Sequence, residues 1–434
     1  MRGCSWGFAI VLLGGCFEEG TQIPPTSGDG STSTSSSTGV PDSSTGMVSA
    51  DTTATTDPTT GSTGDATTTD SSGSSGPIPI MCGDTMVAPG ELCLDSEVVQ
   101  ANGSIVSARL GDVFNDEPDD ILYIAGGQLI VRPSMGNGNF AGPVSSLMVP
   151  SNNFITTDLD GNELLDLAAH QDNGSVASMR GQGDANFDVH DTLPATDTPQ
   201  GVVTGDLDGD GDLDVIAAAG LADPSLYVGI NNGQGQLTAQ PAVTASGVVN
   251  GLAVDDFNGD GNLDVAFGVD GVGWQGIAIR PGDGAGGFGT QELTEQVVGV
   301  VDIASGDFDG NGFPDLASIS VANNSLMLTL RSKDGTIAVE TISTDGGPRV
   351  LLAADLDADG ADELIVGDDV GDSIRIYELD DRLTLVLTED VSVADAVVDL
   401  DTGDVNNDGA LDVAATVITN NPASDLVVML ISNP

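Results

Sequence analysis

Short loops rich in aspartate recur along this chain, and their composition points to metal binding. The clearest copy, residues 206–214, reads DLDGDGDLD, with acidic side chains at loop positions 1, 3, 5 and 9 and glycine at position 6. Alternate side chains of a tight loop can turn toward one centre, position 7 can add its carbonyl, and glycine permits the sharp bend. Calcium takes 6 to 8 oxygen ligands in flexible geometry, whereas magnesium demands a stricter octahedron. No clustered His or Cys accompanies the loops, which argues against zinc, copper or iron.

Seven loops start at residues 112, 158, 206, 256, 307, 355 and 404, and are called loops 1 to 7 here. Loops 2 to 7 carry a near-complete ligand set, so we expect about six calcium sites. The expected side-chain ligands are Asp158, Asp160, Asn162 and Asp166; Asp206, Asp208, Asp210 and Asp214; Asp256, Asn258, Asp260 and Asp264; Asp307, Asp309, Asn311 and Asp315; Asp355, Asp357, Asp359 and Glu363; and Asp404, Asn406, Asp408 and Asp412. The expected position-7 carbonyls belong to Leu164, Asp212, Asn262, Phe313, Ala361 and Ala410.

Two loops depart from the pattern. Loop 1 has Phe114 at position 3 and Pro118 at position 7, so that Asp112, Asp116 and Asp120 predict a weak or empty site. Loop 2 has Glu163 where glycine is usual, which predicts backbone strain. An alternative is that Asp, Asn and Gly simply form good turns. Six near-complete copies in register favour the metal interpretation.

The charge of the chain agrees with bound divalent cations. Ten basic and 67 acidic residues give a formal net charge of −57. So much like charge opposes a compact state unless cations neutralise part of it. The same acidity excludes a nucleic-acid-binding surface, because no basic stripe is present to contact phosphates.

The spacing of the loops predicts the fold. Successive starts lie 46, 48, 50, 51, 48 and 49 residues apart, a period typical of propellers and other repeat proteins. Short runs rich in Val, Ile and Leu follow each loop, as in residues 213–219 and 226–230, and glycine-rich turns separate them. These runs read as strands, four to a repeat. The sequence therefore predicts an all-β, seven-bladed β-propeller over residues 95–434.

The last repeat is too short for its fourth strand, because only 30 residues follow Asp404. A strand-like stretch at residues 97–100 precedes loop 1. We expect this stretch to complete the last blade and close the ring, which would remove exposed sheet edges.

The loop, its flanking strands and the glycine-rich hairpin resemble the FG-GAP or VCBS repeats of propellers like those of integrin α-subunits. The resemblance covers about residues 95–434. It implies calcium loops between the first and second strands of each blade, and ligands on the opposite face. It also implies an adhesive or scaffolding role, although some bacterial members are enzymes. Trp274 and His170 are expected in connections between second and third strands, and so are candidates for that ligand face.

The N-terminal region predicts export and anchoring. Residues 1–16 resemble a bacterial lipoprotein signal peptide that ends in Leu13-Gly-Gly-Cys16, which makes Cys16 the candidate lipidated residue. An ordinary signal peptide with a chance cysteine is the alternative. Residues 17–80 are rich in Ser, Thr, Gly and Asp and predict a disordered stalk. Cys82 and Cys93, within a segment at 81–94 that is similar to a surface-protein motif of myxobacteria, are expected to form a disulfide after export.

No sequence signature of a nucleophile elbow, zinc protease, phosphate loop or dinucleotide site is present. The expected function is therefore binding: a monomeric, lipid-anchored, calcium-stabilised propeller at the bacterial surface or in the periplasm that recognises a glycan or protein. Two alternatives stay open. One is an exported polysaccharide-acting enzyme that uses the face opposite the loops. The other is a passive structural surface protein.

Overall fold

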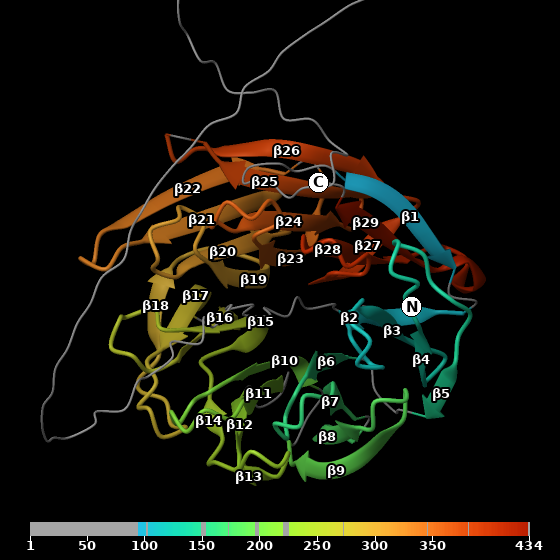
Figure 1. Cartoon of the computed structure of the whole chain (residues 1–434). Helices are drawn as coiled ribbons and strands as arrows, with labels where there is room; N and C mark the ends of the chain where they lie inside the picture. The colour runs from blue at the N-terminus through green and yellow to red at the C-terminus, as the bar shows by residue number, and fades with distance from the viewer. Residues whose placement is uncertain are drawn as a thin grey trace, which may run out of the picture. The chain divides into compact units, whose positions relative to one another are not determined.

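The computed structural model describes residues 94–100, 103–148, 153–171, 173–195, 199–219, 225–271, 273–344, 346–380 and 382–432. These residues form a ring of seven antiparallel sheets, the blades of a β-propeller (Figure 1). A single 3-10 turn, η1 (Pro422–Ser424), is the only helical element in the described ranges, and no helix there is long and apolar enough to cross a membrane. Cys16, Cys82, Cys93, the signal peptide and the stalk lie outside the described residues.

Blades 1 to 6 are each built from strands that follow one another in the sequence. Blades 1 to 3 consist of β2 (Ile105–Gly111), β3 (Asp120–Ala125), β4 (Gln128–Arg132) and β5 (Ser145–Met148); β6 (Phe154–Thr157), β7 (Asp166–His170), β8 (Val176–Gly181) and β9 (Phe187–Leu193); and β10 (Pro199–Gly205), β11 (Asp214–Ala219), β12 (Ser225–Asn231), β13 (Leu237–Ala239) and β14 (Val243–Thr244). Blades 4 to 6 consist of β15 (Val248–Asp255), β16 (Asp264–Gly271), β17 (Trp274–Arg280) and β18 (Glu292–Glu295); β19 (Val300–Gly306), β20 (Asp315–Ser320), β21 (Ser325–Arg331) and β22 (Ile337–Ser343); and β23 (Pro348–Ala354), β24 (Glu363–Asp368), β25 (Ser373–Leu379) and β26 (Leu385–Ser392).

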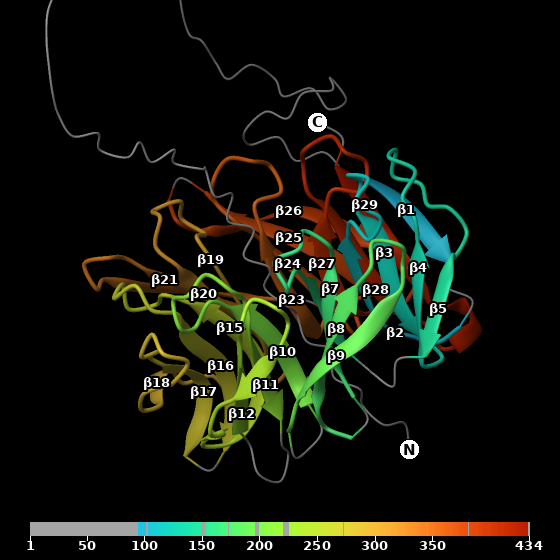
Figure 2. The ribbon, with the colours of Figure 1, turned by 60° about the horizontal axis from the view of Figure 1, so that its bottom comes forward.

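Blade 7 combines both ends of the propeller. Its sheet order is β1-β29-β28-β27, with β1 (Leu94–Gln100), β27 (Ala396–Gly403), β28 (Asp412–Ile418) and β29 (Leu426–Ser432). The register of β1 on β29 is antiparallel and runs from Leu94 opposite Ser432 to Gln100 opposite Leu426. Figures 1 and 2 both show β1 beside β29. The first described strand therefore occupies the outer position of the last blade.

Burial decreases from the centre of the ring to its rim. All six residues of β11 (DVIAAA) and of β20 (DLASIS) are buried, whereas most residues of the outer strand β22 are exposed. Small residues let neighbouring blades approach closely: a Cβ on Gly367 of β24 would lie 2.5 Å from Val397 Cγ1 of β27. The apolar core thus lies between the inner strands of adjacent blades. The polar loops lie outside this core, at the ends of the strands.

Candidate metal-binding loops

All seven acidic loops connect the first strand of a blade to its second strand, and the position-9 acid is the first residue of that second strand. Loop 3, for example, leaves β10 at Gly205 and enters β11 at Asp214. The repeat that was visible in the sequence therefore corresponds to one structural position in every blade.

The carboxylate of the position-1 aspartate accepts hydrogen bonds from backbone N–H groups of its own loop. In loop 3, Asp206 Oδ1 accepts the N–H groups of Gly209 at 2.8 Å and Asp210 at 3.1 Å, and Oδ2 accepts that of Gly211 at 3.0 Å. The position-1 aspartates of the other loops accept the N–H groups of positions 5 and 6 in the same way: Asp112, Asp158, Asp256, Asp307, Asp355 and Asp404.

Positions 3 and 5 make similar local bonds. In loop 6, Asp357 Oδ1 accepts the N–H of Asp359 at 3.1 Å, and Asp359 Oδ1 accepts that of Ala361 at 2.8 Å. Asp and Asn side chains favour such turns. Because each carboxylate oxygen has more than one acceptor site, the bonds orient these groups and leave capacity for a cation.

Backbone strain occurs at two positions of the loop. Position 6 has positive φ throughout, and Glu163 has φ 67° there, as the sequence predicted, with Glu117 at 85° in loop 1. Position 4 also has positive φ in all seven loops, including the non-glycine residues Ala358 at 55° and Asn407 at 59°. The strain at position 4 was not predicted, although glycine stands there in four loops: Gly161, Gly209, Gly259 and Gly310.

The position-9 acid, at the start of the second strand, accepts hydrogen bonds from the loop and from the end of the third strand. In blade 3, Asp214 Oδ2 accepts the N–H of Leu207 at 2.9 Å, and Oδ1 accepts that of Asn231, at the end of β12, at 2.7 Å. The same pair of bonds occurs at Asp120, Asp166, Asp315 and Asp412. Position 9 therefore has a structural role in addition to the metal role that the sequence predicted.

Burial raises the pKa of these position-9 acids. Burial raises the pKa of Asp214 to about 6, although the N–H groups of Asn231 and Leu207 oppose the change. Burial likewise raises the pKa of Asp315 to about 7 and that of Glu363 to about 9. In loop 6, burial and then the neighbouring carboxylate of Asp359 raise the pKa of Asp357 to about 6. Crowded carboxylates of this kind favour a cation at the centre of the loop.

The carboxylates of the loops converge as a hard cation requires. One ligand atom from each member lies within 4.8 Å of the others in Asp158, Asp160 and Asp166; Asp206, Asp208 and Asp210; Asp307, Asp309 and Asp315; and Asp355, Asp357 and Asp359. Two buried oxygens, Asp160 Oδ1 and Asp264 Oδ2, have no hydrogen-bond partner. Oxygen-only donor sets with unused buried acceptors fit calcium better than a softer metal. In loop 1, Asp112, Asp116 and Asp120 converge as well, while Phe114 packs against the core of blades 1 and 2.

The loops also connect neighbouring blades. The position-2 carbonyl of four loops accepts a bond from the next blade: Val405 from Ser134 Oγ at 2.6 Å, Leu159 from Asn231 Nδ2 at 2.6 Å, Leu207 from Gly286 N at 3.2 Å, and Phe257 from Arg331 Nη2 at 2.8 Å.

Two position-8 aspartates add further interblade bonds. Asp119 exchanges backbone and side-chain bonds with Asp404, both at 2.9 Å, and Asp362 does the same with Asp307 at 3.0 and 2.8 Å. The acidic loops therefore lie where blades meet, and an ion bound in a loop would also order a joint of the ring.

The two residues proposed for the opposite face have different outcomes. His170 is the last residue of β7 and only 5% exposed, and burial lowers the pKa of its imidazole to about 3. Its expected position in the connection between the second and third strands is wrong, because the residue still belongs to β7 and is buried. A ligand contact by His170 stays a prediction. Trp274 is the first residue of β17, and its side chain lies outside the described part of the structure.

Two arginines on this acidic body, Arg349 and Arg280, make local contacts. Arg349 Nη1 lies 2.8 Å from Asp369 Oδ1. Arg280 donates to the carbonyls of Gly289 at 2.7 Å and Thr244 at 2.6 Å.

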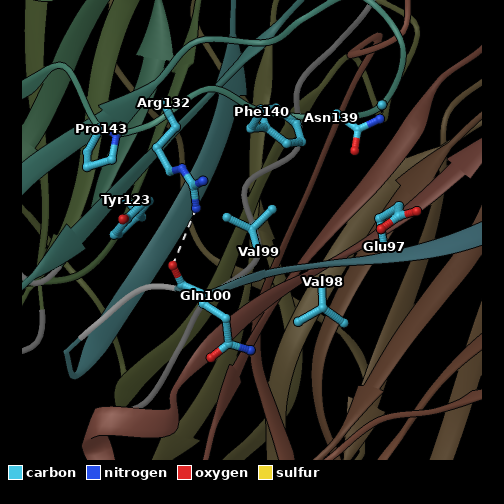
Figure 3. A pocket seen from close by; sticks show the side chains of 10 residues that line it. Glu97, Val98, Val99, Gln100, Tyr123, Arg132, Asn139, Phe140 and Pro143 are labelled. Atoms are coloured by element: carbon cyan, nitrogen blue, oxygen red, sulfur yellow. Dashed lines mark hydrogen bonds between the residues drawn. The ribbon is translucent and has the colours of Figure 1, made fainter.

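A groove of about 360 Å³ lies between β1 and blade 1 (Figure 3). Its lining includes Val99, Tyr123, Phe140 and Pro143, together with Arg132, whose Nη1 donates to the Gln100 carbonyl at 3.3 Å. This groove was not predictable from any single motif, because it forms only when β1 joins the last blade.

Comparisons with known proteins agree with this architecture. The model of the FG-GAP-like repeat matches residues 158–217 and 307–366, which contain loops 2 and 3 and loops 5 and 6. No curated protein sequence matches the chain. Two similar solved structures are crystal structures of BBS1N in complex with ARL6DN, one soaked with lead and one with mercury. They are 13% and 12% identical to this chain, with TM-scores of 0.53 and 0.52. The alignments cover 78% and 77% of this chain and 96% and 97% of the BBS1N chains. The chain therefore contains FG-GAP-like repeats and has the fold of a seven-bladed β-propeller.

Proposed function

We propose that the protein is a calcium-stabilised binding module that presents a propeller to a protein or glycan partner. The observation that carries the proposal is the repetition of one converging carboxylate loop at the joints between blades. A site that recurs at every structural joint is typical of a structural role. A catalytic centre, in contrast, is needed only once in a chain. The similar BBS1N propellers are in complex with a protein, which favours a protein over a glycan as the partner class.

We propose that the module is exported and held by a lipid on Cys16 at a bacterial membrane, with residues 17–80 as a stalk. The proposal rests on the apolar stretch before Leu13-Gly-Gly-Cys16 and on the composition of the stalk. A surface position would also supply calcium at the concentrations that extracellular calcium modules use.

Calcium that binds only the folded state stabilises it by RT ln(1 + [L]/Kd), about 2.7 kcal/mol per site at 100 times Kd. We expect the melting temperature of the chain to rise with calcium and to fall when a chelator is added. Magnesium at the same concentration, measured by the same scan, is the control for ionic strength and charge screening. A melting temperature that calcium leaves unchanged would exclude the calcium role.

Binding is tested separately, with proteins from the cell envelope and with a glycan array, each with calcium and with chelator. We expect saturable binding to one protein partner that chelation abolishes. Binding to a glycan instead would correct the partner class. A folded, calcium-loaded chain that binds neither would refute the binding function and leave a structural role.

A further inference from the structure

Arg180 of β8 contacts loop 2 of its own blade. Its guanidinium Nε forms an ion pair with Asp160 Oδ2, and the side chains of Arg180 and Asp160 are 40% and 6% exposed. Asp160 is the position-3 ligand of loop 2. Across the described ranges, no other ion pair joins an arginine or lysine to one of the predicted side-chain ligands.

The equivalent residue of the other blades is never basic. The residue after Arg180, Gly181, donates its N–H to the position-9 acid Asp166 at 2.7 Å. Because Ser134, Asn231, Gly282, Arg331 and Ser432 make the same bond, the residues before them are the equivalents of Arg180. In blade 6, strand register gives the equivalent, because Leu364 pairs with Tyr377 as Leu167 pairs with Met179. These equivalents are Pro133, Ile230, Pro281, Leu330, Ile431 and Glu378.

The guanidinium changes the charge that loop 2 offers to a cation. Its ligand set carries three carboxylates, Asp158, Asp160 and Asp166, and Asn162 at position 5 adds none. An arginine bonded to one of the three lowers the formal charge to −3 + 1 = −2 and places a fixed positive charge beside the ion's position. Like charges a few ångströms apart repel strongly where one group is buried. Glu163 at φ 67° adds backbone strain to the same loop.

Arg180 also supplies a connection between blades. Its Nη2 donates to the carbonyl of Gln234, in the hairpin between β12 and β13 of blade 3, at 3.0 Å. One side chain therefore neutralises one carboxylate of loop 2 and joins the loop to the next blade. In the other loops, a bound metal ion would neutralise the carboxylates. It would also order the joint between the loop and the next blade.

We propose that Arg180 is the built-in counter-ion of loop 2, so that this loop binds no calcium at concentrations that fill the complete loops. The inference rests on the proposed calcium role of those loops and corrects the expected number of sites from six to five.

The experiment measures bound calcium per full-length chain, by native mass spectrometry and equilibrium dialysis. We compare the wild type with Arg180→Gln and with a matched control, Arg349→Gln, whose ion pair with Asp369 lies outside the loops. Arg180→Gln is expected to bind one more ion than the wild type, and Arg349→Gln the same number. No gain in Arg180→Gln would overturn the inference.

A second pair of variants covers the case in which Arg180→Gln fails to fold. Asp160→Asn is expected to leave the wild-type number unchanged, whereas the equivalent Asp208→Asn in loop 3 is expected to weaken one site. Loss of an ion in Asp160→Asn would refute the role of Arg180 and keep the calcium proposal. A wild type that binds no calcium at all would refute both.

Discussion

Arg109 of β2 and Asp399 of β27 form a buried ion pair, with Nη1 and Oδ2 2.5 Å apart and side chains 1% and 3% exposed. The pair joins the inner strand of the first blade to that of the last. Nearby, Asp401 Oδ2 accepts the N–H of Leu110 at 2.7 Å, and the guanidinium lies 5.9 Å from the centre of the Phe154 ring. The closing joint of the ring is therefore bridged by charge as well as by apolar packing.

Replacement of Arg109 by Met is expected to destabilise the chain strongly. It would leave the buried carboxylates of Asp399 and Asp401 without a counter-charge, and breaking a buried pair from one side costs about 3–5 kcal/mol. The matched control is Arg382→Met, because the Arg382 side chain is 87% exposed and its contact with Asp380 is 4.0 Å long. Denaturant unfolding of both variants checks the difference, and equal stabilities would contradict it.

The raised pKa of Asp401 leads to a prediction of how the stability of the chain depends on pH. Burial raises the pKa of Asp401 to about 7, although Arg109 and the Leu110 N–H oppose the change. A carboxyl whose pKa is higher in the folded state favours folding while it is protonated, and this contribution is lost as pH rises from about 4 to about 7. Asp401→Asn stays neutral at every pH, so the variant is expected to gain stability relative to the wild type across this interval.

The measurement for Asp401 is the difference in unfolding free energy between the two proteins at pH 5 and pH 8. Buried carboxylates that do not contact Arg109 titrate equally in both proteins and cancel. A difference that does not change with pH would show that Asp401 stays ionised in the folded protein.

The position-9 acid should stabilise the fold even without metal. Asp214→Ala would leave the N–H groups of Leu207 and Asn231 without an acceptor, and each unsatisfied buried group costs about 1–3 kcal/mol. Asp214→Asn keeps one acceptor and is expected to lose roughly half as much. Both are measured by denaturant unfolding in chelator. If the two variants are as stable as the wild type there, position 9 serves only the metal.

The sequence predicted the features that repeat. Its acidic loops, at intervals of 46 to 51 residues, imply seven blades, and the structure contains seven sheets with one loop each. Position 9 was recognised only as a ligand, because its bonds to Leu207 and Asn231 depend on where the third strand ends. That position depends on register, which no single loop reveals.

Features that occur once were not predictable in the same way. Arg109 and Asp399 are 290 residues apart, and neither belongs to the repeated motif. Arg180 reads as an ordinary polar residue of a strand until the register places it over Asp160. His170 was assigned to a connection because a boundary that shifts by a residue or two decides whether a side chain faces the core.

The position of β1 leads to a prediction that does not depend on whether the loops bind metal. Val99 is 6% exposed and belongs to the apolar cluster that joins blades 7 and 1, whereas its neighbour Val98 is 53% exposed because alternate residues of a strand face opposite ways. Val99→Asp would place an unpaired charge in that cluster and is expected to lower stability by several kcal/mol, while Val98→Asp is expected to change it by less than about 0.5 kcal/mol. Thermal and denaturant unfolding of the two variants form a matched comparison.

Similar losses for both would mean that β1 does not hold this register on β29. A large loss for Val99→Asp alone would show that a strand about 330 residues from its partner in the sequence completes the core of the last blade, as the pairing of Val99 with Val427 requires.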